Sequence, residues 1–394
     1  MATVVDISRS VADLKDETIA IRREFHAYPE LAYEEVETAG RIAKRLEALG
    51  MRVEKGIGVT GVLGIMEGGK PGKTLLIRAD MDALPMPELP DDRPHKSKIE
   101  NRNHSCGHDM NMAVVLGTAA VLARHKQDIS GRVAFVFQPG DEPQTGARKM
   151  FDDGLLDKVK PDYILSHHPT PEADAGKVIV PPIIWCSMDM YKLTINGAPG
   201  WFGRREQAVD TALIAGQLIT ALYQAMAYEA PGHETVLFNV TSMQGAGQFP
   251  GLALGQVELQ LALQTYNPDL RKTLIKRIEE IADSVVKGLR GSYTLESTHA
   301  LPPGVNAPEV SEAVVNAARP LVGEENIIRE WRNVFPDDSA LFLEKAPGCM
   351  FMLGIVNKAK GIDQMWHTPG FDIDEDTLSL GVEIMSRAAL DLLK

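Results

Sequence analysis

The feature of this sequence that most limits its fold is a repeated order of short apolar run, polar loop and helical pattern. Apolar runs occupy 61–66, 74–79, 131–137 and 163–165, and a long helical pattern covers 109–124. An opening helical pattern over 11–49 is interrupted at Tyr28-Pro29, which predicts two helices. Buried strands that alternate with helices are typical of a largely parallel sheet, so the sequence predicts an α/β domain.

The middle of the chain has a different pattern. The runs 190–195, 235–241 and 255–263 alternate apolar and polar residues, as one-sided strands do, and helical stretches over about 206–228 and 268–289 lie among them. The α/β pattern resumes near Glu309. We therefore predict one domain made of 1–185 and 299–394, with a smaller α+β domain, 186–298, inserted into it.

Composition and charge exclude several classes of protein. A chain of 394 residues is longer than one hydrophobic core usually serves. The net charge of −13, without a basic stripe, argues against nucleic-acid binding. No run reaches the roughly 18 apolar residues of a membrane span, and the charged first segment has no secretory apolar core. The three scattered cysteines do not form a disulfide framework, which favours a cytoplasmic location.

Side chains that can bind metal ions gather at the ends of the predicted elements. They are Asp80 and Asp82 after 74–79, Cys106 and His108 before the helix, Asp141 and Glu142 after 131–138, His167 and His168 after 163–166, and His367 in Trp-His-Thr-Pro. In open α/β sheets the reactive crevice lies beyond the carboxyl ends of the strands, so we expect these segments to converge. Each residue alone would more often be structural, but their shared placement favours a site. Imidazole, thiolate and carboxylate together suit zinc, manganese, cobalt or nickel.

This combination of side chains indicates hydrolysis by metal-activated water. A bound metal ion lowers the pKa of water toward about 7 and polarises the group that is attacked. A carboxylate beside a ligating one can carry the proton to the leaving nitrogen, and Asp141 and Glu142 form such a pair. The sequence therefore predicts a metal-dependent hydrolase that cleaves a carbon–nitrogen bond in a small molecule.

A set of motifs, in chain order, resembles the aminoacylase/carboxypeptidase family of metallopeptidases. They are Phe25-His-Ala-Tyr-Pro-Glu-Leu, Arg78-Ala-Asp-Met-Asp-Ala-Leu-Pro, His104-Ser-Cys-Gly-His-Asp, Phe137-Gln-Pro-Gly-Asp-Glu and His367-Thr-Pro. More narrowly, they are similar to the amidohydrolase branch, which includes hippurate hydrolases and auxin-conjugate hydrolases. The resemblance implies an inserted lid domain that carries a subunit contact, so we expect a homodimer or a higher homo-oligomer.

The resemblance also implies a ligand set. Carried over by position, one or two divalent ions, most simply manganese or zinc, would be bound by Cys106, His108, Glu142, His168 and His367. His168 is chosen over His167 because its spacing to the following Pro and Gly matches the branch. Asp141 takes the place of the catalytic base.

Other residues near these motifs are expected to play supporting roles. Asp80, Asp82 and Asp109 would orient the ligands as hydrogen-bond acceptors. Asp109 also suits the N-cap of the following helix. Three further residues are expected to be structural: His104, Cys186 and Cys349.

The sequence departs from the branch at positions that bear on the substrate. The base is Asp141 instead of Glu, Trp201 replaces a lid His that steadies an oxyanion, Gln264 replaces an Arg, a lid Asn is absent from Gly247-Gln-Phe-Pro, and Phe335-Pro-Asp-Asp-Ser replaces Ser-Glu-Asp-Phe. An oxyanion donor can contribute about 2.7–4 kcal/mol to catalysis, so the loss of one bears on the reaction.

Three hypotheses about the reaction follow from these departures. The first is hydrolytic deamination of an aromatic amine, 5-nitroanthranilate to 5-nitrosalicylate and ammonia, a step of aromatic-compound degradation in which the ring takes up the developing charge. Trp201 would then stack on the ring, unless it only packs the lid, and Arg204 or Arg205 would pair with a carboxylate or nitro group. The alternatives are an N-acyl amino acid amidohydrolase and an inactive metal-binding relative.

Overall fold

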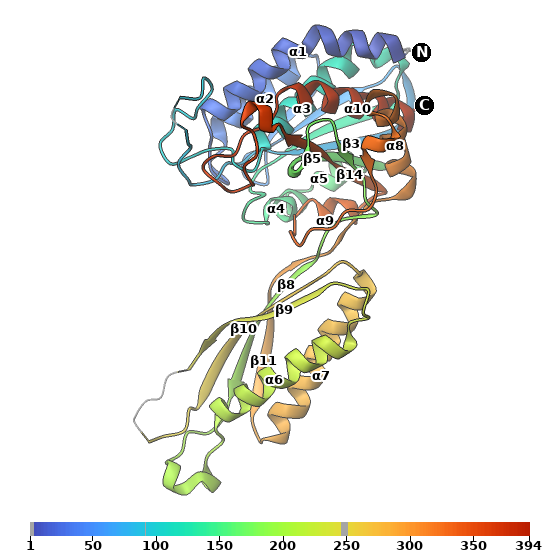
Figure 1. Cartoon of the computed structure of the whole chain (residues 1–394). Coiled ribbons are helices and arrows are strands. Elements are labelled where there is room, and N and C mark those ends of the chain that lie inside the picture. Colours follow the sequence, from blue (N-terminus) through green and yellow to red (C-terminus); the bar gives the residue numbers. More distant parts are fainter. Residues whose placement is uncertain (1–3, 91, 246–250) are drawn as a thin grey trace. The chain divides into compact units, whose positions relative to one another are not determined.

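The computed structural model describes residues 4–90, 92–245 and 251–394 (Figure 1). The chain divides into two compact units. The first comprises Met1–Ile184, Val305–Arg332 and Asp338–Lys394, and the second comprises Trp185–Gly304 and Asn333–Asp337. The domains expected from the sequence, 1–185 with 299–394 and 186–298, differ from these units at the junctions and over 333–337.

The first unit is built on one mixed sheet. Its described strands are β1 (Arg52–Ile57), β2 (Gly61–Glu67), β3 (Lys70–Asp80), β4 (Ser130–Gln138), β5 (Tyr163–Asp174), β6 (Val178–Ile179), β13 (Ile327–Ile328) and β14 (Gly348–Val356). They lie in the order β1-β2-β4-β3-β5-β14-β6-β13. The central strands β4, β3, β5 and β14 run parallel, whereas β1 and β2 add an antiparallel edge. The predicted α/β domain with a largely parallel sheet is confirmed.

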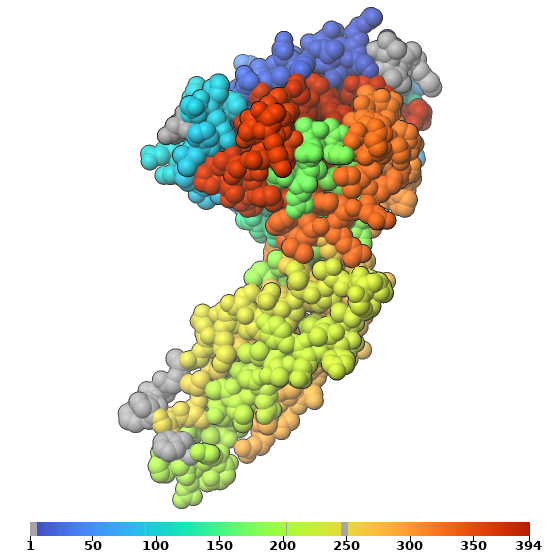
Figure 2. Space-filling model, in the orientation of Figure 1, coloured from blue at the N-terminus to red at the C-terminus, as the bar shows by residue number. Residues whose placement is uncertain are grey.

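Helices pack against this sheet and against one another. The longer ones are α1 (Val4–Ala27), α2 (Val36–Ala48), α3 (His108–Arg124), α8 (Pro308–Val322) and α10 (Asp376–Leu392). The shorter ones are α4 (Gly146–Asp152), α5 (Leu155–Val159) and α9 (Ala340–Leu343). α3 contacts α1, α10 and β3, which explains why nearly all of its residues are buried. Figure 2 shows blue N-terminal and red C-terminal segments side by side on the surface of this unit.

The second unit has its own core. Its described strands β8 (Met188–Asn196), β9 (Val236–Gln244), β10 (Gln256–Thr265) and β11 (Ser292–Leu301) form an antiparallel sheet in the order β11-β8-β10-β9. Helices α6 (Thr211–Glu229) and α7 (Pro268–Gly288) pack on it through buried residues such as Leu218, Leu261 and Ile278. The predicted α+β module is confirmed. Two short strands, β7 (Ile183–Trp185) and β12 (Gly304–Val305), pair where the chain passes between the units.

Several element boundaries differ from the sequence-based prediction for identifiable reasons. α6 begins at Thr211 instead of near 206, because the Asp210 side chain accepts hydrogen bonds from the backbone N–H groups of Ala212 and Leu213. α3 begins at His108, so Asp109 lies in its first turn and is not its N-cap. No helix among the described residues is long and apolar enough to cross a lipid bilayer.

Candidate metal centre

The carboxyl ends of the central strands bring together the segments that carry the predicted ligands. β3 ends at Asp80, and β4 ends just before the segment that contains Asp141 and Glu142. The sequence analysis expected a strand to end at 166, but β5 continues through His168 to Asp174. β3 pairs with β5 only as far as Ser166, so His168 lies beyond that pairing, at the same edge as the other segments.

The predicted ligands form two groups that share one thiol. The first contains Cys106, His108 and His168, and the second contains Cys106, Glu142 and His367; within each, the ligand atoms lie within 4.8 Å of one another. The distance from His168 Nε2 to Cys106 Sγ is 3.7 Å, and that from His367 Nε2 to Glu142 Oε2 is 3.4 Å. Bonds of about 2.0–2.3 Å place the ligand atoms of a tetrahedral site about 3.3–3.8 Å apart. One pair in each group therefore has the spacing of ligands on a shared metal ion, and Cys106 belongs to both groups.

Hydrogen bonds to the far ring nitrogens orient the two buried histidines. His108 Nδ1 lies 2.8 Å from the backbone oxygen of Asp82, and His168 Nδ1 lies 2.8 Å from that of Pro169. A carbonyl oxygen only accepts, so each Nδ1 carries a proton, and the Nε2 of each ring is the nitrogen left to bind a metal ion when the imidazole is neutral. His167 belongs to neither group, and its ring nitrogens have no hydrogen-bond partner among the described residues.

Burial shifts the pKa values of the ligand side chains, and a bound cation would have to overcome some of these shifts. Burial raises the pKa of Glu142 to about 8 and raises the pKa of the Cys106 thiol well above its usual value. Burial lowers the pKa of His168 to about 4, which keeps its imidazole neutral and able to bind. A divalent ion stabilises the thiolate and the carboxylate, so this donor set fits a metal ion.

His367 occupies the open side of the cluster. Its backbone is left-handed, with φ 57°, a conformation that is uncommon for a residue other than glycine and that clusters at functional sites. Its backbone N–H donates to the Ser105 oxygen at 2.9 Å, which ties it to the segment of Cys106. The side chain of His367 is 52% exposed, whereas His108 and His168 are buried. Solvent and substrate can therefore reach the second group more easily than the first.

Gly107 allows the turn before α3 to pack closely against the strand that carries His168. Its φ is +92°, and a Cβ at this position would lie 2.4 Å from Pro169 Cγ. A larger residue would have to separate Cys106 and His108 from His168, so the turn requires glycine.

The predicted base is held by a buried arginine that the sequence analysis missed. Arg78, near the carboxyl end of β3, is fully buried and donates through Nη2 to Asp141 Oδ1 and through Nη1 to Asp80 Oδ2 at 2.7 Å. Asp141 Oδ2 lies 3.8 Å from His108 Nε2. One oxygen of Asp141 is therefore fixed while the other faces the ligand cluster. The available signal was an arginine inside an otherwise apolar strand.

The three supporting aspartates have different partners. Asp82 lies behind His108, with its Oδ1 3.3 Å from Nδ1, and also accepts hydrogen bonds from the backbone of Asp141 and Glu142. Asp80 Oδ1 lies 3.8 Å from His108 Nε2. The expected role of Asp109 must be corrected. Because it lies inside the first turn of α3, its Oδ2 accepts from Arg22 Nε at 2.6 Å and lies 2.7 Å from His26 Nδ1, and it contacts no ligand histidine.

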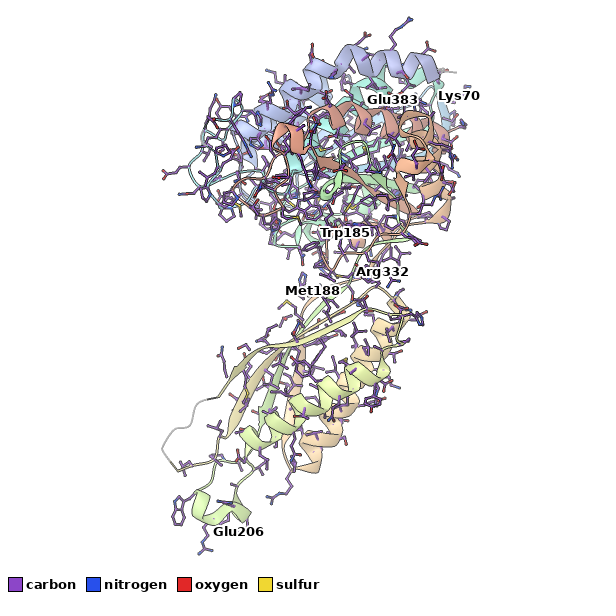
Figure 3. The ribbon with its side chains drawn as sticks, in the orientation of Figure 1. Lys70, Trp185, Met188, Glu206, Arg332 and Glu383 are labelled. Carbon is purple, nitrogen blue, oxygen red and sulfur yellow. The ribbon has the colours of Figure 1, made fainter. Side chains whose placement is uncertain are left out.

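The residues predicted to contact substrate belong to the second unit. Trp201 is 57% exposed, and Arg204 lies 3.7 Å from Glu206. Figure 3 shows Glu206 at the end of this unit opposite Met188. Arg205 lines a hollow beside the first turn of α6. Gln264 donates to the Val334 oxygen at 3.0 Å and to Cys186 Sγ at 3.3 Å, so its amide is used within the unit. The segment of the absent Asn, 247–250, lies outside the described residues.

The remaining residues expected to be structural are also placed by the structure. His104, Cys186 and Cys349 are buried. The Phe335-Pro-Asp-Asp-Ser segment contributes Asp338, whose Oδ1 accepts a hydrogen bond from Gln138 Nε2 at 2.6 Å. Asp338 Oδ1 also lies 3.4 Å from Arg78 Nη2, so this segment is part of the support of Arg78.

Comparison with known proteins agrees with this site. Residues 76–391 match peptidase family M20/M25/M40. The chain is 32% identical over 390 residues to thermostable carboxypeptidase 1 of Saccharolobus solfataricus, covering 97% of this chain and 96% of that protein. It is 29% identical to N-acetylcysteine deacetylase of Bacillus subtilis, covering 95% and 97% of the two chains.

A solved structure gives the same result for the fold. The crystal structure of YxeP from Bacillus subtilis, described as a dinuclear metal-binding peptidase of family M20, matches with a TM-score of 0.82 and 27% identity, over 97% of this chain and 99% of that one. The family resemblance seen in the sequence is thereby confirmed. The chain belongs to peptidase family M20/M25/M40 and is a metal-dependent hydrolase that acts on carbon–nitrogen bonds.

Proposed function

We propose that this protein hydrolyses the amide bond of N-acyl amino acids and releases the free amino acid. The observation that carries the proposal is the cluster of Cys106, His108, Glu142, His168 and His367. The names of the two relatives, a carboxypeptidase and a deacetylase, both describe cleavage of an amide bond, which supports this substrate class.

The cluster would hold one or two divalent ions. Two groups that share the Cys106 thiol offer two positions, and the related YxeP structure is described as dinuclear. Ions held by these residues would supply a water of lowered pKa and polarise the scissile carbonyl group. The imidazoles, thiolate and carboxylate favour manganese or zinc over calcium.

Asp141 is proposed to move the proton. Arg78 fixes Oδ1 of Asp141, while Oδ2 faces the ligand cluster 3.8 Å from His108 Nε2. Asp141 Oδ2 would accept a proton from the attacking water and return it to the leaving nitrogen, as a general acid–base does. The short side chain makes the contact with Arg78 important, because it sets how far the carboxylate reaches.

Deamination of an aromatic ring, the reaction first favoured from the sequence, gains no support from the related proteins. That hypothesis was drawn from the absence of lid groups that the amidohydrolase branch has, including the Arg that Gln264 replaces. The structure gives Gln264 two hydrogen bonds within its own unit, which is a structural use that requires no aromatic substrate. Amide hydrolysis is therefore the stronger proposal.

A paired assay separates the two reactions. Metal-depleted protein, reloaded with manganese or zinc, should release the amino acid from N-acetyl or N-benzoyl amino acids and should release no ammonia from 5-nitroanthranilate. A chelator should abolish the activity, and the metal should restore it. Ammonia and 5-nitrosalicylate from nitroanthranilate, without amino acid release, would refute the proposal; turnover of neither would favour an inactive metal-binding relative.

We also propose that the second unit pairs with a second copy of this chain. Among the described strands β9 lies at the edge of its sheet, and a strand edge favours further pairing. The outer face of α6 presents Leu213, Tyr223 and Tyr228, which are 53%, 43% and 91% exposed, and the helix carries no charge before its last residue, Glu229. An apolar, uncharged helix face beside a free strand edge suits a two-fold symmetric contact.

Charge placed on this face should separate the subunits. We expect sedimentation at micromolar concentration to give a dimer or larger homo-oligomer for the wild type and a monomer for Leu213→Glu combined with Tyr228→Glu, because both substitutions would bring like charges together. The matched control is Lys276→Glu on α7, whose side chain is 76% exposed on a helix that is charged throughout. A monomeric wild type would rule out the contact.

A further inference from the structure

The motif Phe25-His-Ala-Tyr-Pro-Glu-Leu contributes no residue to the ligand groups, yet part of it is deeply buried. Phe25 and His26 are 0% and 1% exposed, at the C-terminal end of α1. Arg22, one turn earlier on the same helix, is also 0% exposed. Charged side chains are almost never buried to this extent without partners, so the contacts of these residues indicate what the motif does.

Arg22 connects two segments that carry ligands. Its Nε donates to Asp109 Oδ2 at 2.6 Å, and Asp109 is the residue after His108. Its Nη2 donates to Asp372 Oδ1 at 2.8 Å, on the segment that follows His367. One guanidinium group, with its donors in a fixed plane, therefore sets the distance between the start of α3 and the His367 segment.

His26 adds a second connection. Its Nδ1 lies 2.7 Å from Asp109 Oδ2, and its Nε2 lies 3.0 Å from Glu88 Oε1. The loop that contains Glu88 crosses the His367 segment, since Leu89 N–H donates to the Pro369 oxygen at 2.7 Å and Arg93 Nη1 donates to the Phe371 oxygen at 2.6 Å. His26 therefore links α3 to the same segment by another route.

The turn after α1 reaches a third ligand-bearing segment. The backbone oxygen of Glu30 accepts a hydrogen bond from Ala83 N–H at 2.8 Å, and Leu31 forms a parallel bridge with Ala83. Ala83 directly follows Asp82, whose backbone oxygen lies against His108 Nδ1. The end of α1 and its following turn thus contact the segments of Asp82, His108 and His367.

We propose that Arg22 and His26 are positioning residues that hold the His108 and His367 segments at the spacing required to bind metal ions. The inference rests on the metal centre proposed above. Neither residue touches the ligand atoms; both act through Asp109, Glu88 and Asp372. Substitution of a residue that orients metal ligands without binding the metal typically lowers metal affinity by about 10–100-fold.

Cobalt(II) binding to the full-length, metal-depleted protein tests this inference, because its affinity and visible spectrum report ligand geometry without any substrate. Arg22→Lys keeps the charge but loses the planar fork, so we expect cobalt affinity to fall about 10-fold or more and the spectrum to change. The matched control is Arg23→Lys on the same helix, since the Arg23 side chain is 47% exposed and pairs with Glu375. The control should bind cobalt as the wild type does.

Two further variants protect the test from a folding defect. Asp372→Asn removes the charge that Arg22 contacts on the His367 segment, at a side chain that is 13% exposed, and His26→Gln shortens the link between Asp109 and Glu88. Thermal unfolding of the metal-free proteins shows which variants are folded. Folded variants that bind cobalt as tightly as the wild type, with its spectrum, would overturn the inference. A wild type that binds no cobalt would instead overturn the metal centre itself.

Discussion

Replacement of Asp141 by Asn is expected to lower kcat by at least about 100-fold while metal ions remain bound and the fold stays intact. General acid–base groups typically contribute 10²–10⁴-fold to rate, and an amide cannot take up the proton. Asn retains an oxygen that can accept from Arg78, so the position of the side chain should be preserved. Steady-state kinetics together with metal content by mass spectrometry check both parts of this expectation.

Asp141→Glu is the matched control for the charge. It restores a carboxylate with one more methylene group, and we expect it to be far more active than Asp141→Asn, with kcat set by how well the longer side chain keeps its contact with Arg78. A near-normal kcat for Asp141→Asn would move the proton-carrying role to another group. Loss of metal from that variant would instead make Asp141 a ligand.

The sequence predicted the parallel sheet and the convergence of the ligand segments because both depend on local patterns. Short apolar runs bounded by Gly and Pro, such as 74–79, are typical of buried strands, and parallel strands present their carboxyl ends at one edge of the sheet. Asp80, Asp141 and His168 follow or end such runs, so their proximity could be inferred without any knowledge of distant contacts.

The support of the site could not be inferred in the same way. Arg22 finds its carboxylates 87 and 350 residues away in the chain, and no periodicity in α1 indicates which distant residue an inward-facing charge will meet. β1 and β11 were also missed, because their mostly exposed, polar residues give no apolar run. The partner of Asp109 was misassigned because an Asp at the start of a helix can be either an N-cap or a member of a buried ion pair, and the sequence looks the same in both cases.

The adjacent histidines of β5 provide the most discriminating test of the ligand set. Successive side chains of a strand point to opposite faces, so His167 and His168 have different surroundings although both are buried. His168 Nε2 lies 3.7 Å from Cys106 Sγ, and its Nδ1 is held by the Pro169 oxygen. His167 lies against the Phe351 ring, with a distance of 5.9 Å between ring centroids. One substitution applied to each residue therefore separates metal binding from packing.

We expect His168→Gln to lower metal affinity by more than about 100-fold, and to lower activity with it. Substitution of residues that only orient the ligands lowers affinity by up to about 100-fold, and the loss of a ligand should exceed that. His167→Gln should keep both affinity and activity. Thermal unfolding with and without zinc gives the readout, because a ligand at 100 times its Kd stabilises the folded state by about 2.7 kcal/mol. Zinc should therefore raise the Tm of the wild type and of His167→Gln by more than that of His168→Gln, which keeps only the group of Cys106, Glu142 and His367. The opposite pattern would assign the ligand to His167, and an equal response of both variants would remove this strand from the metal site.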